Sequence, residues 1–242
     1  MNLIIDVGNT FIKLAVYKND RLLKKELVEQ ADFDKSVNDF LDLFNVKQSI
    51  ISSVGNVSNS SVKNLSKKLT VLELNSSTKI PFKNLYKTPR TLGVDRIALV
   101  SASAHKYPKS NVLIIDCGSC ITYDFINSAN EYLGGAISPG IRLRYETLHN
   151  LTANLPLLEK KKPKNLIGNS TESSIHSGVI NGILIEIDGI VNKYKTKYPD
   201  LTVILTGGDS KFLSKRLKSS IFANSNFLLE GLNHILEYNS VK

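Results

Sequence analysis

Two short stretches of this 242-residue chain place an acid, a glycine and small polar residues directly after an apolar run. The first is Asp6-Val7-Gly8-Asn9-Thr10, and the second is Asp116-Cys117-Gly118-Ser119-Cys120. A strand that ends in such a turn leaves backbone N–H groups that can bind phosphate oxygens, while the acid can hold a cation or an ordered water. Lys13 follows on the next strand, where a cation can reach a bound phosphate. The pair of turns indicates a clamp for a nucleoside triphosphate, and the alternative is two ordinary hairpin turns.

A third stretch, Tyr86–Arg96 (YKTPRTLGVDR), carries an acid and a guanidinium side by side at the expected start of a helix. Asp95 could take a proton from a substrate hydroxyl, and Arg96 could bind a substrate carboxylate or a transferring phosphate through its two-pronged donor set. A helix-start acid beside a surface arginine is the alternative interpretation.

Other site classes lack their motifs. The chain has no G-x-x-x-x-G-K-[ST], no G-x-G-x-x-G after a strand and no G-x-S-x-G. Cys117 and Cys120 form a C-x-x-C, but no second pair could complete a zinc site, so we expect two small buried residues. The four histidines share no ligand spacing. Thr206–Asp209 (TGGD) ends a strand, and either a ligand contact or a plain turn fits it.

Composition indicates a globular protein of the cytoplasm. Hydrophobic residues make up 42%, and the net charge of +9 comes from 31 basic and 22 acidic residues. The apolar runs are too short to span a membrane, the first residues predict no signal peptide, and two cysteines suit a reducing compartment. Lys160–Lys164 (KKKPK) is expected to be a solvated loop. We therefore expect no membrane partner and no nucleic-acid partner.

An internal repeat indicates how these turns are held. Residues 3–23 and 113–133 align without a gap, each with a strand, an Asp-x-Gly turn, a second strand, a tight turn and a third strand. Helical and strand patterns then alternate in both halves, which predicts an α/β fold. The expected helices lie at 34–44, 58–69, 92–107, 139–150 and 171–198, with two more after a strand at 201–205, and another strand lies at 49–54. We expect the boundary between lobes near residue 110.

These motifs, in this order, resemble the type III pantothenate kinases of the sugar kinase, heat-shock chaperone ATPase and actin superfamily. Tyr86–Arg96 is similar to the family signature Tyr-x-x-Pro-x-x-Leu-Gly-x-Asp-Arg, and the two Asp-Gly turns are similar to its phosphate loops. Gly134–Gly140 (GGAISPG) is similar to a further family segment, and Gly168–Gly178 to the start of its substrate-side helix. The resemblance covers nearly the whole chain.

The resemblance implies two ribonuclease-H-like lobes, 1–110 and 111–242, each a mixed β-sheet with flanking helices, and a nucleotide cleft between them. It implies ATP-dependent phosphorylation of pantothenate, the first step towards coenzyme A, by a cytoplasmic homodimer that uses Mg²⁺ and a monovalent cation, K⁺ or NH₄⁺. Asp95 would be the general base, and Asp116 would bind the monovalent cation. The residues implied for pantothenate, including the base, are Tyr86, Gly93, Val94, Asp95, Arg96 and Thr171. Those implied for ATP are Asp6, Val7, Gly8, Asn9, Thr10, Phe11, Ile12, Lys13 and Ser119.

The second loop departs from the family pattern at two positions. Ser119 stands where the family usually has Thr, and Cys120 where it usually has Ala. The serine keeps the hydroxyl and the cysteine keeps the small size, so we expect both to be tolerated. An alternative function on the same fold is a catalytically inactive regulatory factor, for which the basic loop would be the best feature. Against it, competent residues occupy every position expected for catalysis.

Overall fold

The computed structural model describes residues 1–8, 11–53 and 58–240, and they group into two compact units. Unit 1 comprises Met1–Pro108, Asn130–Tyr132 and Asn226–Lys242, and unit 2 comprises Lys109–Ala129 and Leu133–Ser225. The division predicted near residue 110 assigns residues 226–242 to the second lobe, whereas in the structure this segment is grouped with unit 1. The lobe boundaries 1–110 and 111–242 stay a prediction.

Unit 1 is built on a five-stranded sheet in the order β3-β2-β1-β4-β5. Its strands are β1 (Asn2–Val7), β2 (Ile12–Lys18), β3 (Arg21–Val28), β4 (Gln48–Ser53) and β5 (Thr70–Glu73). The first three are antiparallel neighbours, and β4 and β5 extend the sheet in parallel from β1. Asn19 has a φ of 52°, a left-handed value that Asn tolerates, and so forms the predicted tight turn between β2 and β3.

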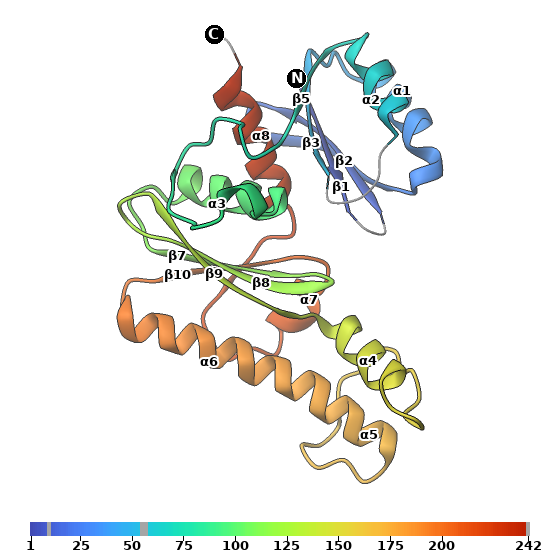
Figure 1. Cartoon of the computed structure of the whole chain (residues 1–242), viewed down its shortest axis with the longest axis vertical. Coiled ribbons are helices and arrows are strands. Elements are labelled where there is room, and N and C mark those ends of the chain that lie inside the picture. The colour runs from blue at the N-terminus through green and yellow to red at the C-terminus, as the bar shows by residue number, and fades with distance from the viewer. Residues whose placement is uncertain (9–10, 54–57, 241–242) are drawn as a thin grey trace. The chain divides into compact units, whose positions relative to one another are not determined.

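Helices cover both faces of this sheet. On one face lie α1 (Phe33–Leu43) and α2 (Asn59–Ser66), as Figure 1 shows. Phe33, Phe40 and Leu65 of this layer are buried against odd-numbered residues of β1 such as Leu3 and Ile5. The opposite face carries α3 (Val94–Lys106) and α8 (Phe227–Asn239), of which α8 contacts β1 and β4 and α3 contacts β4. Because strand side chains alternate, Asn2, Ile4 and Asp6 share that second face. Two 3₁₀ turns, Gln30–Asp32 and Pro89–Thr91, precede α1 and α3.

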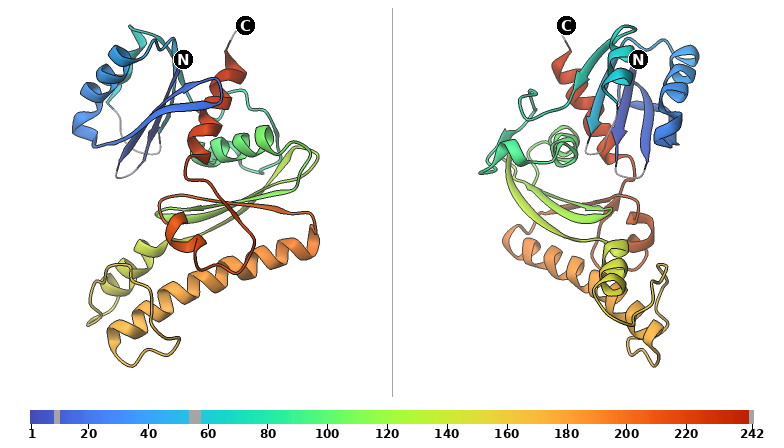
Figure 2. Two further views of the ribbon diagram at one scale, coloured as in Figure 1. Left: turned by 180° about the vertical axis from the view of Figure 1, so that it is seen from behind. Right: turned by 45° about the vertical axis from the view of Figure 1, so that its right-hand side comes forward.

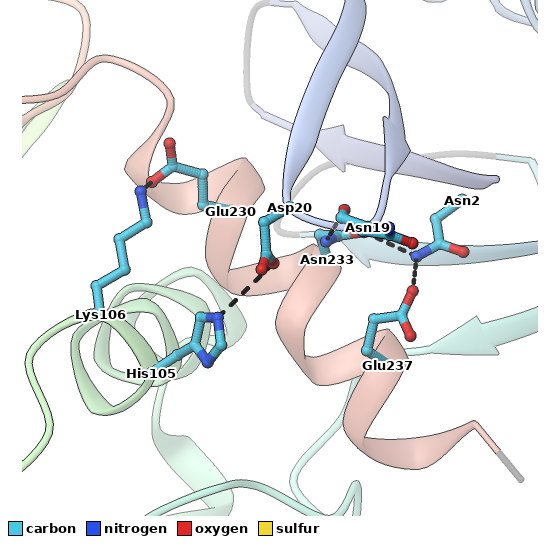
Figure 3. A network of polar contacts seen from close by, with 8 residues as sticks. All are labelled: Asn2, Asn19, Asp20, His105, Lys106, Glu230, Asn233 and Glu237. Atoms are coloured by element: carbon cyan, nitrogen blue, oxygen red, sulfur yellow. Dashed lines mark hydrogen bonds and ion pairs between the residues drawn. The ribbon is translucent and has the colours of Figure 1, made fainter. Parts of the chain in front are cut away.

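The contact between α3 and α8 is unusually close. A Cβ on Gly231 of α8 would lie 1.8 Å from the carbonyl oxygen of Ala98 on α3, so only glycine fits there. A polar network fixes the other side of α8: Asn2 Nδ2 donates to Asn233 Oδ1 (2.8 Å) and Glu237 Oε1 (2.6 Å), and Asn233 Nδ2 donates to the carbonyl of Asn19 (3.0 Å; Figure 3). The buried amides are thereby satisfied.

Unit 2 contains most of the second sheet, whose order is β11-β10-β7-β8-β9-β6. Its strands are β7 (Val112–Cys117), β8 (Cys120–Ile126), β9 (Glu131–Pro139), β10 (Thr202–Thr206) and β11 (Phe222–Ala223). The two-residue β6 (Lys83–Asn84) belongs to unit 1 and pairs with Glu131 and Tyr132 at the start of β9, which are grouped with the same unit.

The helices of unit 2 are α4 (Ile141–Asn150), α5 (Thr171–His176), α6 (Gly182–Lys197) and α7 (Ser210–Ser214). A π-helical segment, Ser177–Asn181, joins α5 to α6, so the predicted long helix at 171–198 is confirmed as one helical stretch. Figure 2 shows α6 running along one face of the sheet, where Ile183, Ile187 and Val191 pack on the odd-numbered residues of β7. By length and composition, Thr171–Lys197 is the one described helical stretch that could cross a membrane, and core helices pass the same test.

The two sheets repeat one topology, which confirms the predicted α/β class and explains the sequence repeat. The order β3-β2-β1-β4-β5 in unit 1 corresponds to β9-β8-β7-β10-β11 in unit 2. The two hairpins differ in the length of their loops, however, although the sequences align without a gap. Val7 pairs with Ile12, whereas Cys117 pairs with Ile121, so the second hairpin loop is one residue shorter. The residue opposite Asp6 is Lys13, but the residue opposite Asp116 is Thr122.

Candidate functional site

The first Asp-Gly turn joins β1 to β2 in unit 1. Asp6 is buried near the end of β1, and its Oδ2 accepts a 2.8 Å hydrogen bond from Nζ of Lys13, the residue opposite it on β2. Lys13 keeps 42% of its side chain exposed, so its ammonium lies at the boundary with solvent. Gly8 N donates to the carbonyl of Phe11 across the turn (3.1 Å). Asn9 and Thr10, also predicted for ATP, lie outside the described residues; Val7, Phe11 and Ile12 complete the turn.

The predicted substrate segment forms the start of α3. Pro89–Thr91 makes a 3₁₀ turn, Gly93 is the residue before the helix, and Val94 and Asp95 are its first two residues. Asp95 Oδ1 accepts a 2.8 Å hydrogen bond from the backbone N–H of Arg96. A Cβ on Gly93 would lie 2.3 Å from that same Oδ1. The glycine therefore leaves the space into which the Asp95 carboxylate folds.

Arg96 is buried, with 5% of its surface exposed, and lies over an aromatic stack. Its guanidinium carbon is 5.5 Å from the ring centre of Tyr86, and Tyr86 stacks on Tyr132 with ring centres 6.0 Å apart. Such cation–π contacts hold a guanidinium in place without neutralising it. Within unit 1, the structure thus brings Tyr86, Gly93, Asp95 and Arg96 together around one helix start, as a substrate site requires.

The second Asp-Gly turn joins β7 to β8 in unit 2. Gly118 N donates to the carbonyl of Cys120 (3.0 Å), which makes this turn tighter than the first. Ser119, predicted to bind ATP, is exposed at its tip. Gly140, the residue directly before α4, packs against this turn so closely that a Cβ there would lie 2.2 Å from the carbonyl oxygen of Gly118. Gly140 N also donates to the carbonyl of Ser119 (3.0 Å), so α4 begins directly against the turn.

Asp116, the predicted cation ligand, has two neighbours that bear on its role. Gly207 of the TGGD stretch has a φ of 91°, and a Cβ there would lie 2.3 Å from Oδ1 of Asp116. The TGGD glycine therefore belongs to the surroundings of Asp116 rather than to an isolated turn. Thr122 is the residue opposite Asp116 on β8, and its buried Oγ1 has no hydrogen-bond partner among the described residues. An unmet buried hydroxyl beside a carboxylate is a donor set that suits an oxygen-ligated cation.

Thr171, predicted to contact substrate, opens α5 in unit 2. The helix is capped by Ser170, whose Oγ accepts from the N–H of Ser173, with the reciprocal bond also formed. Thr171 is exposed and lines a pocket of about 1040 Å³ between α4 and the α5 end of the long helix. Most of the lining is apolar or small, and Arg144 is its charged member: Pro139, Arg144, Thr147, Leu148, Leu155, Gly168, Asn169, Ser170, Thr171, Ser174, Ile175, Gly178 and Val179.

Two further sequence expectations can be compared with the structure. The basic stretch Lys160–Lys164 is largely solvated, as predicted, but Lys160 forms an ion pair with Asp209 of the TGGD stretch. The expectation that both cysteines are buried is wrong for Cys120, which is exposed at the start of β8, while Cys117 is buried. Among the described residues, no three His, Cys, Asp or Glu side chains form a metal-binding group.

Comparison with known proteins gives one consistent family. The family model described as type III pantothenate kinase matches residues 2–193. The type III pantothenate kinase of Christiangramia forsetii is 54% identical over 243 residues, an alignment that covers 100% of both chains.

Solved structures share the fold. A protein of Campylobacter jejuni named for the Baf family of transcriptional activators superposes with a TM-score of 0.63 at 22% identity, over 98% of both chains. A glucokinase from an Antarctic psychrotroph superposes with a TM-score of 0.53 at 11% identity, over 98% of this chain and 99% of that one. At these identities the likeness shows the fold alone, the actin-like fold of sugar kinases.

Proposed function

The chain belongs to the type III pantothenate kinase family and phosphorylates pantothenate with ATP, the first step of coenzyme A biosynthesis, and we propose that Asp95 is its general base. The observation that carries the assignment is the arrangement at the start of α3, where Asp95, Arg96 and Tyr86 gather as a hydroxy acid substrate needs. Kinases of this family use ATP with a divalent metal ion.

Asp95 is suited to accept the proton of the pantothenate hydroxyl. The Arg96 N–H holds Oδ1, which fixes the carboxylate direction, and Oδ2 makes no hydrogen bond to any residue the structure describes. That second oxygen can receive the proton as the hydroxyl attacks the γ-phosphorus. General base catalysis of this kind contributes about 10²–10⁴-fold to the rate. Arg96, oriented by Tyr86, binds the terminal carboxylate of pantothenate in this proposal.

The ATP phosphates are assigned to the two Asp-Gly turns. Phosphoryl transfer depends mostly on positioning and charge neutralisation, which backbone N–H groups and an ammonium can supply. Lys13 is the charged donor of the first turn, and Ser119 supplies the hydroxyl of the second. We assign Asp6–Lys13 and Ser119 to ATP, and Thr171, Gly93 and Val94 to pantothenate together with Tyr86, Asp95 and Arg96.

A monovalent cation, K⁺ or NH₄⁺, is assigned to Asp116. The surroundings fit such an ion because the Asp116 carboxylate and the unsatisfied Oγ1 of Thr122 are oxygen ligands. Gly207 leaves the space beside Oδ1 that a side chain would fill. When bound, the cation would supply positive charge next to the second phosphate loop.

We also propose a homodimer that works in the cytoplasm. Large apolar side chains of unit 2 stand exposed near the Thr171 pocket, among them Leu151 (78%), Leu166 (73%) and Ile167 (83%). Surfaces of this kind mark interaction sites, and we assign the contact between the two copies to this one. Size-exclusion chromatography with light scattering tests it; a monomer at working concentration contradicts it.

A coupled ADP-release assay with ATP, Mg²⁺ and pantothenate tests the function, run in potassium and in sodium. Turnover should require pantothenate and potassium and should collapse in Asp95→Asn. Asp39→Asn, which changes an exposed carboxylate in the same way, is the matched control and should keep full activity. Asp116→Asn should weaken the potassium dependence. A folded protein that binds ATP but turns over no pantothenate contradicts the proposal and favours the inactive regulatory factor.

A further inference from the structure

An ion pair between Arg144 of α4 and Glu186 of α6 lies in unit 2, outside every motif that the sequence singled out. Arg144 Nη2 bonds to Glu186 Oε2, and Tyr123 Oη of β8 donates to the other oxygen, Oε1 (2.9 Å). The arginine and glutamate side chains are 21% and 24% exposed, so solvent screens the pair only in part. Three elements therefore meet at one carboxylate.

The Arg144 guanidinium also bonds to the segment that leads into α4. Nε donates to the carbonyl of Pro139 (2.9 Å), and Nη2 donates to Oγ of Ser138 (3.0 Å). Arg144 is thus tied both to α6 and to the last two residues of β9. This fork needs a planar guanidinium, since one ammonium could not bond to all three partners in these directions.

What this arrangement holds in place is Gly140, the residue between Pro139 and α4. Gly140 N donates to the carbonyl of Ser119, and the missing Cβ leaves room for the carbonyls of Gly118 and Ser119. Because the peptide unit is planar and trans, a Ser119 carbonyl that points at Gly140 makes the N–H of Cys120 point the opposite way, away from α4. The position of Gly140 therefore sets the direction of a backbone donor in the second phosphate loop.

We infer that Arg144 and Glu186 are positioning residues that hold the second phosphate loop in its ATP-binding geometry through Ser138, Pro139 and Gly140. The inference rests on the proposed ATP role of that loop. Neither residue is assigned a contact with the nucleotide; Arg144 fixes the entry into α4, and Glu186 fixes Arg144.

The charge state of Glu186 agrees with this role. Burial by itself would raise the pKa of the carboxyl, but hydrogen bonds from Arg144, Tyr123 and Ser138 and the charge of Arg144 outweigh it, and the pKa lies below its usual value of 4.5. Glu186 is therefore ionised at neutral pH and remains a partner for the guanidinium.

Glu186→Gln is the primary test because Glu186 does not line the Thr171 pocket, whereas Arg144 does. The amide keeps the shape and still accepts from Tyr123, but it removes the charge that holds Arg144. We expect the Kd for Mg·ATP, measured by calorimetry, and the KM for ATP to rise about 2-fold to 30-fold. The KM for pantothenate should change by less than about 2-fold on the same scale. Arg144→Lys should raise the Kd for Mg·ATP in the same range, and Glu186→Gln combined with Arg144→Lys should raise it no further than the stronger single variant.

The matched control is Glu146→Gln, which breaks the exposed Arg142–Glu146 pair on the same helix and should leave both constants unchanged. Unchanged ATP affinity in both Glu186→Gln and Arg144→Lys overturns the inference, as does an equal rise of the two KM values, which a purely structural role would give. The calorimetry separates this outcome from a failure of the proposed function. If the unaltered protein binds ATP but does not phosphorylate pantothenate, the function fails and ATP affinity still decides the inference; if it binds no ATP, both fail.

Discussion

The imidazole rings of His105 and His234 stack almost face to face, with ring centres 4.0 Å apart and an angle of 21° between planes. His105 belongs to α3 and His234 to α8, so the stack lies within the close contact of these helices. Nε2 of His105 is 3.7 Å from Oδ1 of Asp20. Figure 3 shows these two side chains facing each other. The stack places the half-buried imidazole of His234 directly against that of His105.

Stability should therefore fall when the pH drops below neutrality. Burial, followed by the charge of His105, lowers the pKa of His234 from 6.5, while Asp20 and Glu237 act in the opposite direction. Below pH 6.5 the unfolded chain binds a proton that folded His234 resists, so the free energy of unfolding decreases until the pH reaches the lowered pKa. Urea unfolding at several pH values from about 7.5 to about 5.5, which lie on either side of the usual His pKa, measures how the free energy of unfolding depends on pH.

His234→Gln should flatten this slope. The ion pair between Lys106 and Glu230, 2.6 Å apart and joining the same two helices, is left intact in this variant. His149→Gln in unit 2 is the control and should keep the slope of the unaltered protein. An equally steep slope in His234→Gln would show that another group is responsible.

Lys13→Met should reduce kcat/KM for ATP by about 10²–10³-fold, the usual cost of losing one prearranged charged donor. The variant keeps the length of the side chain but removes the ammonium that lies 2.8 Å from Asp6. Initial-rate kinetics at varied ATP measure the change. Lys18→Met, at the exposed end of the same strand, should behave like the unaltered protein. A loss no larger in Lys13→Met than in that control would remove Lys13 from the ATP site.

Two glycine-to-alanine substitutions should change stability in opposite directions. Gly231→Ala places a methyl group 1.8 Å from the Ala98 carbonyl, and we expect a loss of about 1–3 kcal/mol or more from this overpacking. Gly189→Ala on α6 meets no described atom within 4 Å and should gain about 0.5–1 kcal/mol from helix propensity. Chemical denaturation measures both. A stable Gly231→Ala would mean that α3 and α8 can separate without cost.

Hydrogen peroxide should inactivate the enzyme through Cys120. This thiol is exposed next to Ser119, and its oxidation to a sulfenic acid adds an oxygen atom beside the second phosphate loop. Cys117 is protected because burial, followed by the charges of Asp116, Asp209 and Glu186, raises the pKa of its thiol. Activity after mild peroxide treatment should survive in Cys120→Ala and not in Cys117→Ala. Equal sensitivity of the unaltered protein and Cys120→Ala would contradict the idea.

The sequence predicted the features that depend on local patterns. The apolar runs, the Asp-Gly turns and the expected tight turns were sufficient to locate both β-hairpins and their repeat. Asn19 and Asn130, both with a left-handed backbone, form those tight turns. The one-residue difference between the hairpin loops was not predicted, because a gapless alignment cannot show strand register. The short strands β5, β6 and β11 escaped as well, since a few residues carry no periodicity.

Contacts between residues far apart in the chain could not be predicted from the sequence. Arg144 and Glu186 are 42 positions apart in different helices, and neither belongs to a motif. Gly207 was visible as part of TGGD, yet only the fold places it against Asp116, 91 positions earlier. Single-sequence patterns report which face of an element is apolar, not which two elements meet.

The return of α8 to unit 1 has a consequence for how the chain folds as it is made. When the ribosome has synthesised the first 108 residues, the face of the sheet that bears Asn2 still lacks the helix whose Asn233 and Glu237 satisfy that amide. That half must wait, with apolar residues such as Ile4 uncovered, until all of unit 2 has been translated. Unit 2, by contrast, is contiguous apart from Asn130–Tyr132 and can complete its core first. The segment made first is therefore the one completed last, and chaperones have longest access to it.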